Sequence, residues 1–324
     1  MIVCLLVITG ILLLWSHSEA ATSDPVNNSI RKALDYLYKN QALINTGAFL
    51  GNQALIGNRD FAGDWPQYFF ADVKPELLVR DVSPFMVAFM HHSLTNVVES
   101  NLADFNLDPS YGRKARFMRQ QAIQFMRIFS SAPRGINTGP FGFWPSAIPG
   151  SRDSLLGKLA FEILQGPVLE GNLKPVNLSF YPNELAIPDD ADCTANIYVS
   201  FLNDLFFDGG KGLSGTPANY FADWRDTGVV PRRLNPAWMP VATGVYLTWL
   251  NYHNPPDPGI PNGVDLVVNA NVLFALARYG VLNTPGVQDS INLINFVTTN
   301  GLHRTNPDEI SDCTGTARSQ SIAP

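Results

Sequence analysis

The sequence is short of charge, and its few basic residues form no stripe. Only 15% of the 324 residues are charged, and 22 Lys and Arg stand against 28 Asp and Glu, which gives a net charge of -6. Without a basic stripe to neutralise phosphates, the composition excludes a nucleic-acid partner. The 46% hydrophobic content excludes a disordered chain and is enough for a large buried core.

Cysteine is also scarce, with three residues in the whole chain. Cys4 falls in an N-terminal apolar run, so only Cys193 and Cys313 remain for the folded protein. Two cysteines permit one disulfide, for which Cys193 and Cys313 are the candidates, but they exclude a disulfide framework. The alternative for Cys193 is a small buried thiol, and in either case the fold must be held by its core.

The N-terminal apolar run is too short to cross a bilayer as a helix. It extends from Met1 to Trp15, and Ser18-Glu19-Ala20 follows as a small-residue cleavage site. We therefore expect residues 1–20 to be a signal peptide. The protein that remains after its removal is expected to begin at Ala21, to be secreted and extracellular, and to have no stable membrane span. In a secreted chain, the sequons at Asn27 and Asn177 are candidate glycosylation sites.

Common catalytic and metal motifs are missing as well. The sequence contains no HExxH, GxSxG, P-loop or GxGxxG pattern. His91 and His92 are adjacent and would point about 100° apart on a helix, which is a poor metal spacing. We therefore predict neither a metal site nor a cofactor.

The apolar pattern that is present is helical almost throughout, without convincing strand alternation. Some segments are apolar on most of their circumference, as inner helices are, and others are amphipathic, as outer helices are. This contrast predicts an inner and an outer ring of helices. Helices are expected at 27–44, 81–104, 112–131, 153–165, 190–207, 240–252, 264–280 and 286–299.

The connectors between these helices are long and rich in Pro, Gly and aromatic residues. Loops of this kind in a compact domain are usually functional. Trp65, Trp144 and Trp224 lie in them and are candidate substrate-binding residues, because an exposed aromatic face can stack on a sugar or stabilise a cation. The alternative is that these side chains plug the ends of the helical ring.

An internal repeat joins two of the expected inner helices. Superposing 192–201 on 265–274 matches Asp192 with Asp265 and Asn196 with Asn269. Positions i and i+4 share one helix face, so both pairs are predicted to face a common polar interior. Each acid also stands near a helix start, where a carboxylate favours the positive end of the helix dipole, and helix capping is the competing interpretation.

The stretch Asp190-Ala191-Asp192-Cys193-Thr194-Ala195 resembles the DxDDTA motif of class II terpene cyclases, the squalene-hopene cyclase group. Gly-x-Trp at 63–65 and 142–144 is similar to half of the QxxxGxW repeat of that family. The resemblance implies an α/α toroid in which Asp192 is the general acid that protonates an alkene or epoxide, with Asp190 as the motif's first aspartate. Cys193 departs from the motif, because the family has a third aspartate there.

Two other functions remain open on the same residues. Glycosidases pair a carboxylic acid of raised pKa with a carboxylate base, and Asp192 and Asp265 are candidates for that pair. A non-catalytic secreted or extracellular-matrix protein on a degenerate cyclase-like scaffold is the third interpretation. The ligand would be a small apolar molecule or a carbohydrate, and the sequence does not indicate an oligomeric state.

The predicted architecture is an all-α protein with one α/α toroid domain. We expect this domain to occupy residues 21–312 and to be followed by an irregular tail at 313–324. Fewer helices are recognisable than the twelve a complete six-fold double ring requires, so the ring is expected to be incomplete at the C-terminus. Its polar lining is predicted to comprise Asp190, Asp192, Asn196, Asp265 and Asn269.

Overall fold

The computed structural model describes twelve stretches of the chain. These are residues 24–41, 63–65, 67–71, 74–81, 84–99, 107–130, 139–142, 189–213, 215–228, 235–236, 238–250 and 262–310. Most of the described residues are helical, which confirms the all-α class at that level, whereas the toroid stays a prediction. None of the described helices is long and apolar enough to cross a membrane.

The chain divides into two compact units, each made of three stretches. The first unit contains Met1–Ile128, Ala147–Pro182 and Asn203–Lys211, and the second contains Phe129–Ser146, Asn183–Leu202 and Gly212–Pro324. The single domain expected over 21–312 stays a prediction. The predicted helix at 153–165 and the tail at 313–324 lie outside the described residues.

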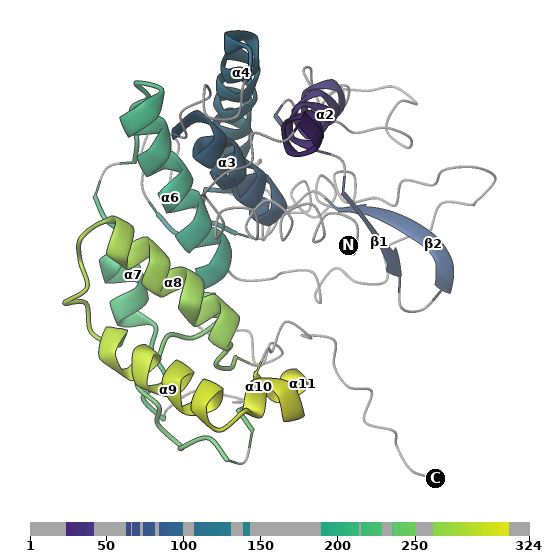
Figure 1. The fold of residues 1–324 in the computed structure, drawn as a ribbon. Coiled ribbons are helices and arrows are strands. Elements are labelled where there is room, and N and C mark those ends of the chain that lie inside the picture. The colour runs from purple at the N-terminus through teal and green to yellow at the C-terminus, as the bar shows by residue number, and fades with distance from the viewer. Residues whose placement is uncertain are drawn as a thin grey trace, which may run out of the picture. The chain divides into compact units, whose positions relative to one another are not determined.

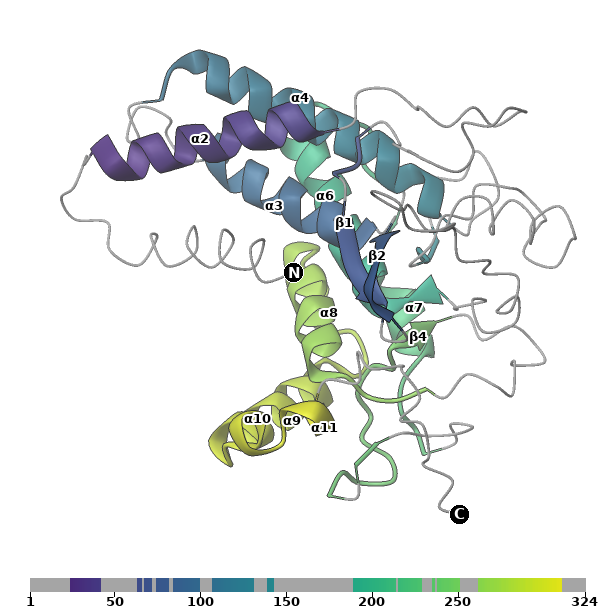
Figure 2. The same ribbon diagram turned by 90° about the vertical axis from the view of Figure 1, so that its right-hand side faces the viewer.

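Three helices form the described core of the first unit (Figure 2). Helix α4 (Pro109–Met126) packs against α2 (Asp24–Asn40) and α3 (Pro84–Glu99). The start of α4 is set by Asp108, whose side chain accepts a hydrogen bond from the Ser110 amide at 2.7 Å, and by proline at the first helical position. These three elements match the helices predicted at 27–44, 81–104 and 112–131.

A two-stranded antiparallel hairpin also belongs to this unit. Strand β1 (Gln67–Ala71) pairs with β2 (Lys74–Asp81), and the register shifts between Phe70 and Ala71. The expectation of a chain without strands is therefore wrong here. After Gln67, the strand residues YFFA are continuously apolar or aromatic rather than alternating, so a period-two search does not find them.

The second unit is built around helices α6 (Ala191–Phe207), α7 (Ala218–Asp223), α8 (Leu266–Arg278) and α9 (Val287–Thr299). Helix α6 belongs to this unit only as far as Leu202. Helices α8 and α9 pack side by side (Figure 1). The short helices α10 (Leu302–Thr305) and α11 (Pro307–Ile310) follow. Helices α6, α8 and α9 confirm the predictions at 190–207, 264–280 and 286–299.

The segment predicted as a helix at 240–252 is not helical where it is described, at 240–250. Its backbone is irregular up to a short strand at its end. Strand β4 (Trp249–Leu250) pairs with β3 (Asp189–Asp190), and Tyr246 forms an isolated bridge with Arg225. A short apolar run is compatible with either a buried helix or a buried strand, so its composition did not decide between them.

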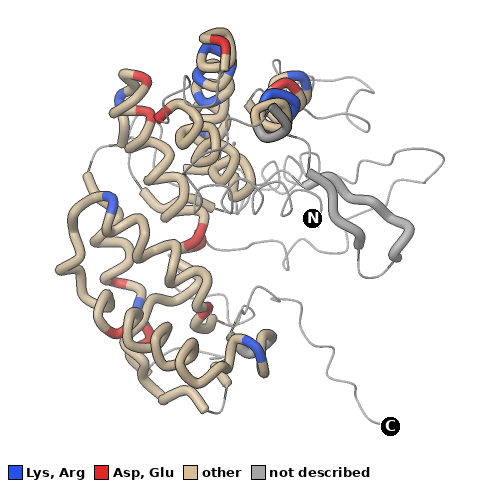
Figure 3. Tube along the Cα trace, viewed as in Figure 1, with Lys and Arg blue, Asp and Glu red and all other residues tan. Residues whose placement is uncertain are grey.

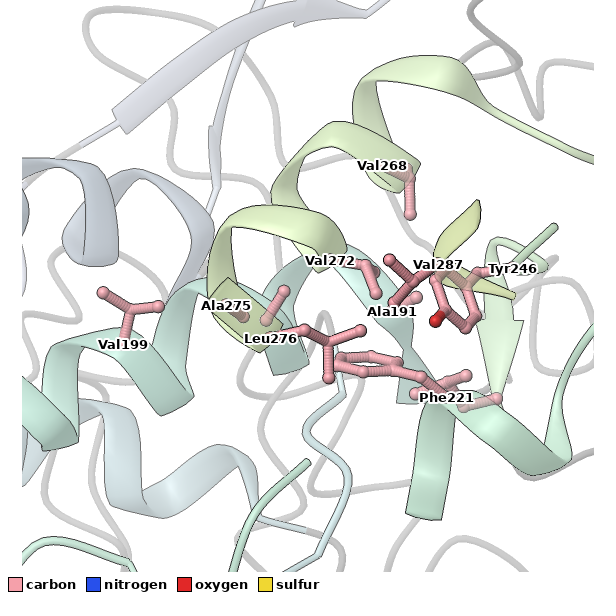
Figure 4. Close-up of a cluster of buried hydrophobic side chains, with 11 residues drawn as sticks. Ala191, Val199, Phe221, Tyr246, Val268, Val272, Ala275, Leu276 and Val287 are labelled. Carbon is pink, nitrogen blue, oxygen red and sulfur yellow. The ribbon is translucent and has the colours of Figure 1, made fainter. Parts of the chain in front are cut away.

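One apolar cluster holds the second unit together (Figure 4). It joins the first turns of α6 to α8, and Tyr246 of the segment at 240–250 lies in it with its ring 5.8 Å from that of Phe221. Burial of its valine, leucine and phenylalanine side chains contributes about 1.5–3 kcal/mol each. The members are Ala191, Ala195, Val199, Phe221, Tyr246, Leu250, Val268, Val272, Ala275, Leu276 and Val287.

Candidate functional site

Two of the three acids singled out by sequence, Asp190 and Asp192, lie where α6 begins. Figure 3 colours the Asp and Glu positions of the described chain red. Asp190 ends strand β3, and its Oδ1 accepts a hydrogen bond from the Cys193 amide at 2.6 Å, which makes Asp190 the cap of α6. Its other oxygen, Oδ2, is buried without a hydrogen-bond partner among the described residues. Burial is the main cause that raises the pKa of Asp190 to about 7, against hydrogen bonds from Cys193 that lower it.

Asp192, two residues later, has a different environment. Its side chain is half-buried, and Oδ1 accepts hydrogen bonds from the amide nitrogens of Asn271 at 2.6 Å and Asn196 at 3.2 Å. Burial and then the nearby charge of Asp190 raise the pKa of Asp192 to about 8. The charge of Asp265 raises it further, and the two amide hydrogen bonds lower it. The surroundings of Asp192 thus favour the protonated form of its carboxyl group.

Asp265 is fully buried and serves as the N-cap of α8. Its Oδ1 accepts hydrogen bonds from the amides of Val267 at 2.7 Å and Val268 at 3.0 Å. The capping interpretation therefore holds for Asp265. Its charge contributes to the raised pKa of Asp192, and the common polar interior stays a prediction.

The structure corrects the frame of the internal repeat by two residues. The caps are Asp190 and Asp265, so the residue that corresponds to Asn269 is Thr194 rather than Asn196. Superposing identical letters had matched Asp192 with Asp265, which play different roles. Asn196 bonds to Asp192, whereas Asn269 is fully buried and bonds to the backbone of a neighbouring segment.

Thr194 and Asn269 make the same contact in the two copies. The Thr194 hydroxyl accepts a hydrogen bond from the Phe141 amide at 2.9 Å and donates to the Phe141 carbonyl at 3.3 Å. The Asn269 side chain accepts from the Tyr246 amide at 3.0 Å and donates to the Tyr246 carbonyl at 2.8 Å. We call this arrangement, in which one side chain satisfies both backbone groups of a buried aromatic residue, the backbone clamp.

A sequence signal for the clamp exists upstream of each helix. TGPFGFW at 138–144 and TGVYLTW at 243–249 share threonine, glycine, an aromatic residue and tryptophan at the same spacing. Gly139 and Gly244 have φ values of 122° and 75°, in the region that favours glycine. The Gly-x-Trp pattern at 142–144 does not reveal this match, because Gly142 corresponds to Leu247 in the second segment.

The three candidate aromatic residues do not assemble into one described site. Trp65 belongs to the first unit, is 5% exposed and donates its indole N–H to the Leu37 carbonyl at 2.9 Å, so its position is that of a core residue and does not support ligand binding. Trp224 is half-buried and packs against the apolar cluster of the second unit. Trp144 lies outside the described residues.

The candidate residues for glycosylation and for a disulfide are only partly within the described residues. Asn27 is 4% exposed, which is not the surface position that a glycosylated asparagine needs, and Asn177 lies outside the described residues. Cys193 is fully buried in α6. Its candidate partner Cys313 lies outside the described residues, so the disulfide stays a prediction.

Within the described residues, no group of three or more His, Cys, Asp or Glu side chains could hold a metal ion. Comparisons with protein-family models, curated proteins and solved structures found no match to this chain. The functional interpretation therefore rests on the residues themselves.

Proposed function

We propose that the protein is a secreted enzyme in which Asp192 acts as a general acid, in chemistry similar to that of class II terpene cyclases. The observation that carries the proposal is that the three carboxyl groups accept hydrogen bonds from different kinds of donor. Asp190 and Asp265 accept hydrogen bonds from helix amides, whereas Asp192 is half-buried, is held by side-chain amides and caps no helix. A carboxylic acid with a pKa of about 8 carries a proton to deliver at neutral pH.

The reaction we propose begins with transfer of this proton to a carbon–carbon double bond or an ether oxygen of the substrate. The Asp192 O–H bond breaks and its electron pair stays on the carboxylate, which accepts hydrogen bonds from Asn196 and Asn271. At a double bond, the π electron pair forms the new C–H bond and a carbocation is left on the substrate. At an ether oxygen, a lone pair forms the new O–H bond and an oxonium ion is left. The alternative of an acid–base pair acting on a glycan is weaker, because the candidate base Asp265 is buried and engaged as a cap.

We also propose that the two clamp-bearing helix starts are neighbouring units of an α/α toroid. Each pairs a non-helical segment with a following helix, and such repetition is what a ring of similar units requires. An experimental structure of the whole chain tests this arrangement. A fold in which the two clamp-bearing helix starts do not belong to one ring would overturn it.

Secretion is part of the same proposal and rests on the sequence of residues 1–20. Expression of the full chain in a secretion-competent eukaryotic host tests it. We expect the protein in the medium with Ala21 at its N-terminus. Retention in the cell with an intact N-terminus would contradict secretion without affecting the role of Asp192.

The catalytic test compares the wild-type protein with Asp192→Asn, with Asp223→Asn as the matched control. Asp223 is exposed on α7 in the same unit and makes no described side-chain hydrogen bond. Small molecules that co-purify with the protein, identified by mass spectrometry, and a panel of linear polyenes and polysaccharides supply the substrates. We expect Asp192→Asn to lose product formation by at least about a hundredfold. Full turnover in that variant would end the assignment.

A non-catalytic role is the second candidate, and one observation favours it. The caps account structurally for two of the three acids, and Cys193 is buried where the resembling motif has its third aspartate. In that case neither class of substrate is turned over by the wild-type protein. The same assays therefore separate the two candidates.

A further inference from the structure

The two oxygens of Asp192 have unequal surroundings. Oδ1 accepts hydrogen bonds from Asn271 at 2.6 Å and Asn196 at 3.2 Å, whereas Oδ2 accepts none from the described residues. An oxygen that accepts two N–H groups is a poor place for the proton of a carboxylic acid, because the added hydrogen would meet the hydrogens of the donors. The proton of Asp192 therefore belongs on Oδ2.

Asn271 differs from the other asparagines at this site because its side-chain amide binds no backbone carbonyl of the described residues. Asn196 donates to the carbonyl of Asp192, and Asn269 donates to that of Asp265, each one turn earlier in its own helix. The hydrogen bond of Asn271 described here goes to the side chain of Asp192, on another helix. Asn271 thus has no local backbone role that would account for its presence.

The position of Asn271 on α8 supports this reading. One turn before it lies Val267, which is 50% exposed, and three residues after it lies Phe274, which is 45% exposed. Asn271 itself is half-buried, and an asparagine within a helix lowers helix propensity relative to alanine. Its contact with Asp192 is the interaction that remains to explain it.

We propose that Asn271 is a positioning residue, which fixes the carboxyl of Asp192 so that Oδ2 carries the proton and delivers it. This inference rests on the proposed role of Asp192 as a general acid. After transfer, the hydrogen bond from Asn271 stabilises the carboxylate that remains. That stabilisation matters because Asp190 at the start of α6 and Asp265 at the start of α8 both disfavour a negative charge on Asp192.

The test replaces Asn271 with leucine, which is similar in size and donates no hydrogen bond. Asn295→Leu is the matched control, because Asn295 is an exposed asparagine of α9 whose side chain makes no described hydrogen bond. The first readout is the pKa of Asp192, from the carboxyl ¹³C shift in the ligand-free protein. The second is the pH profile of turnover.

We expect Asn271→Leu to raise the pKa of Asp192 by about one unit, since a hydrogen bond to the charged form is lost. Turnover should fall at least about tenfold, with its pH profile shifted to higher pH. Asn271→Gln, which keeps an amide donor, should partly restore both, and Asn295→Leu should change neither. If Asn271→Leu does not fold, Asn271→Ser removes the amide with less change of surface and gives the same readouts.

The outcomes separate this inference from the proposed function. An unchanged pKa of Asp192 in Asn271→Leu would overturn the positioning role, even if Asp192→Asn abolished turnover. A shifted pKa together with full turnover in Asp192→Asn would uphold the contact, overturn the role in proton delivery and refute the general-acid assignment.

Discussion

The side chain of Asn269 binds both backbone groups of Tyr246, and the side chain of Thr194 binds both backbone groups of Phe141. Thr194 and Asn269 lie seventy-five residues apart, and each follows the aspartate that caps its helix by four residues. Both clamped residues are almost completely buried, at 0% and 1% exposure. A buried backbone group must find a partner in the protein, because water does not reach it. The clamps therefore fix two non-helical segments to the helices that follow them.

Removing a clamp should destabilise the protein more than its small change in volume suggests. Asn269→Leu leaves the amide and carbonyl of Tyr246 and the hydroxyl of Ser290 without this partner, and we expect a loss of about 3 kcal/mol. Thr194→Val, which is isosteric, should cost about 1–3 kcal/mol. Urea unfolding measures both, with Thr298→Val on the exposed face of α9 as control. Equal stability of Thr194→Val and the control would refute the clamp.

The raised pKa values of Asp190 and Asp192 predict that stability falls as pH rises. Their pKa values are about 7 and about 8 in the folded state, against 3.8 for the ordinary side chain. Between these values the folded chain binds more protons than the unfolded chain, so the stabilisation is complete below about pH 4 and is lost as pH rises to about 8. Asp192→Asn should have a flatter stability profile over this range. A difference between variant and wild type that does not depend on pH would contradict the shift.

His91 should be replaceable without loss of stability. It is fully buried in α3, and neither ring nitrogen has a hydrogen-bond partner among the described residues. Burial, and then the charge of Arg119, lowers the pKa of His91 well below 6.5. As the pH falls through 6.5, this histidine is protonated in the unfolded chain but not in the folded chain, so the folded state loses stability. His91→Leu is expected to gain about 1 kcal/mol at pH 7 and to lose this acid dependence. Thermal unfolding of His91→Leu at pH 5 and 7 is the measurement, with half-buried His92→Leu as control. A loss of more than about 1 kcal/mol at pH 7 would show that His91 has an undetected partner.

The first unit contains a buried ion pair that should tolerate double replacement better than single replacement. Arg119 and Asp208 approach to 3.0 Å with side-chain exposures of 0% and 1%. Burial lowers the pKa of Arg119 and raises that of Asp208, so desolvation opposes both charges. Asp208→Asn should cost about 3–5 kcal/mol by leaving a buried guanidinium with less compensation. Arg119→Met combined with Asp208→Leu should recover much of that loss in urea titrations. Strictly additive single effects would argue against coupling.

Much of the helical pattern could be predicted from the sequence, because it depends on local periodicity. In α3 the buried Val87, Ala88, His91, Leu94 and Thr95 follow the spacing of one helix face. The error at 240–252 arose where periodicity carries no information. There the chain is not helical because its backbone pairs with segments at 224–226 and 263, and such long-range pairing leaves no trace in the local sequence.

The candidate site was predicted in composition but not in detail. Asp190, Asp192 and Asp265 could be found from the sequence, with capping and catalysis as competing interpretations, but the sequence did not show which of the three acids cap helices. That distinction depends on where the first amide of each helix lies, within about two residues, which is the usual uncertainty of helix ends. Asn271 was missed because its partner is on another helix.

The split of α6 between the two units affects how the chain reaches its folded state. Residues 203–211, which belong to the first unit, are separated from the rest of it along the chain by stretches of the second unit. On the ribosome, Arg119 emerges long before Asp208, so its guanidinium cannot be buried with its counter-charge until translation has passed α6. The N-terminal half of a nascent chain must therefore wait for later residues, and a chain stalled before residue 203 remains a substrate for chaperones and proteases.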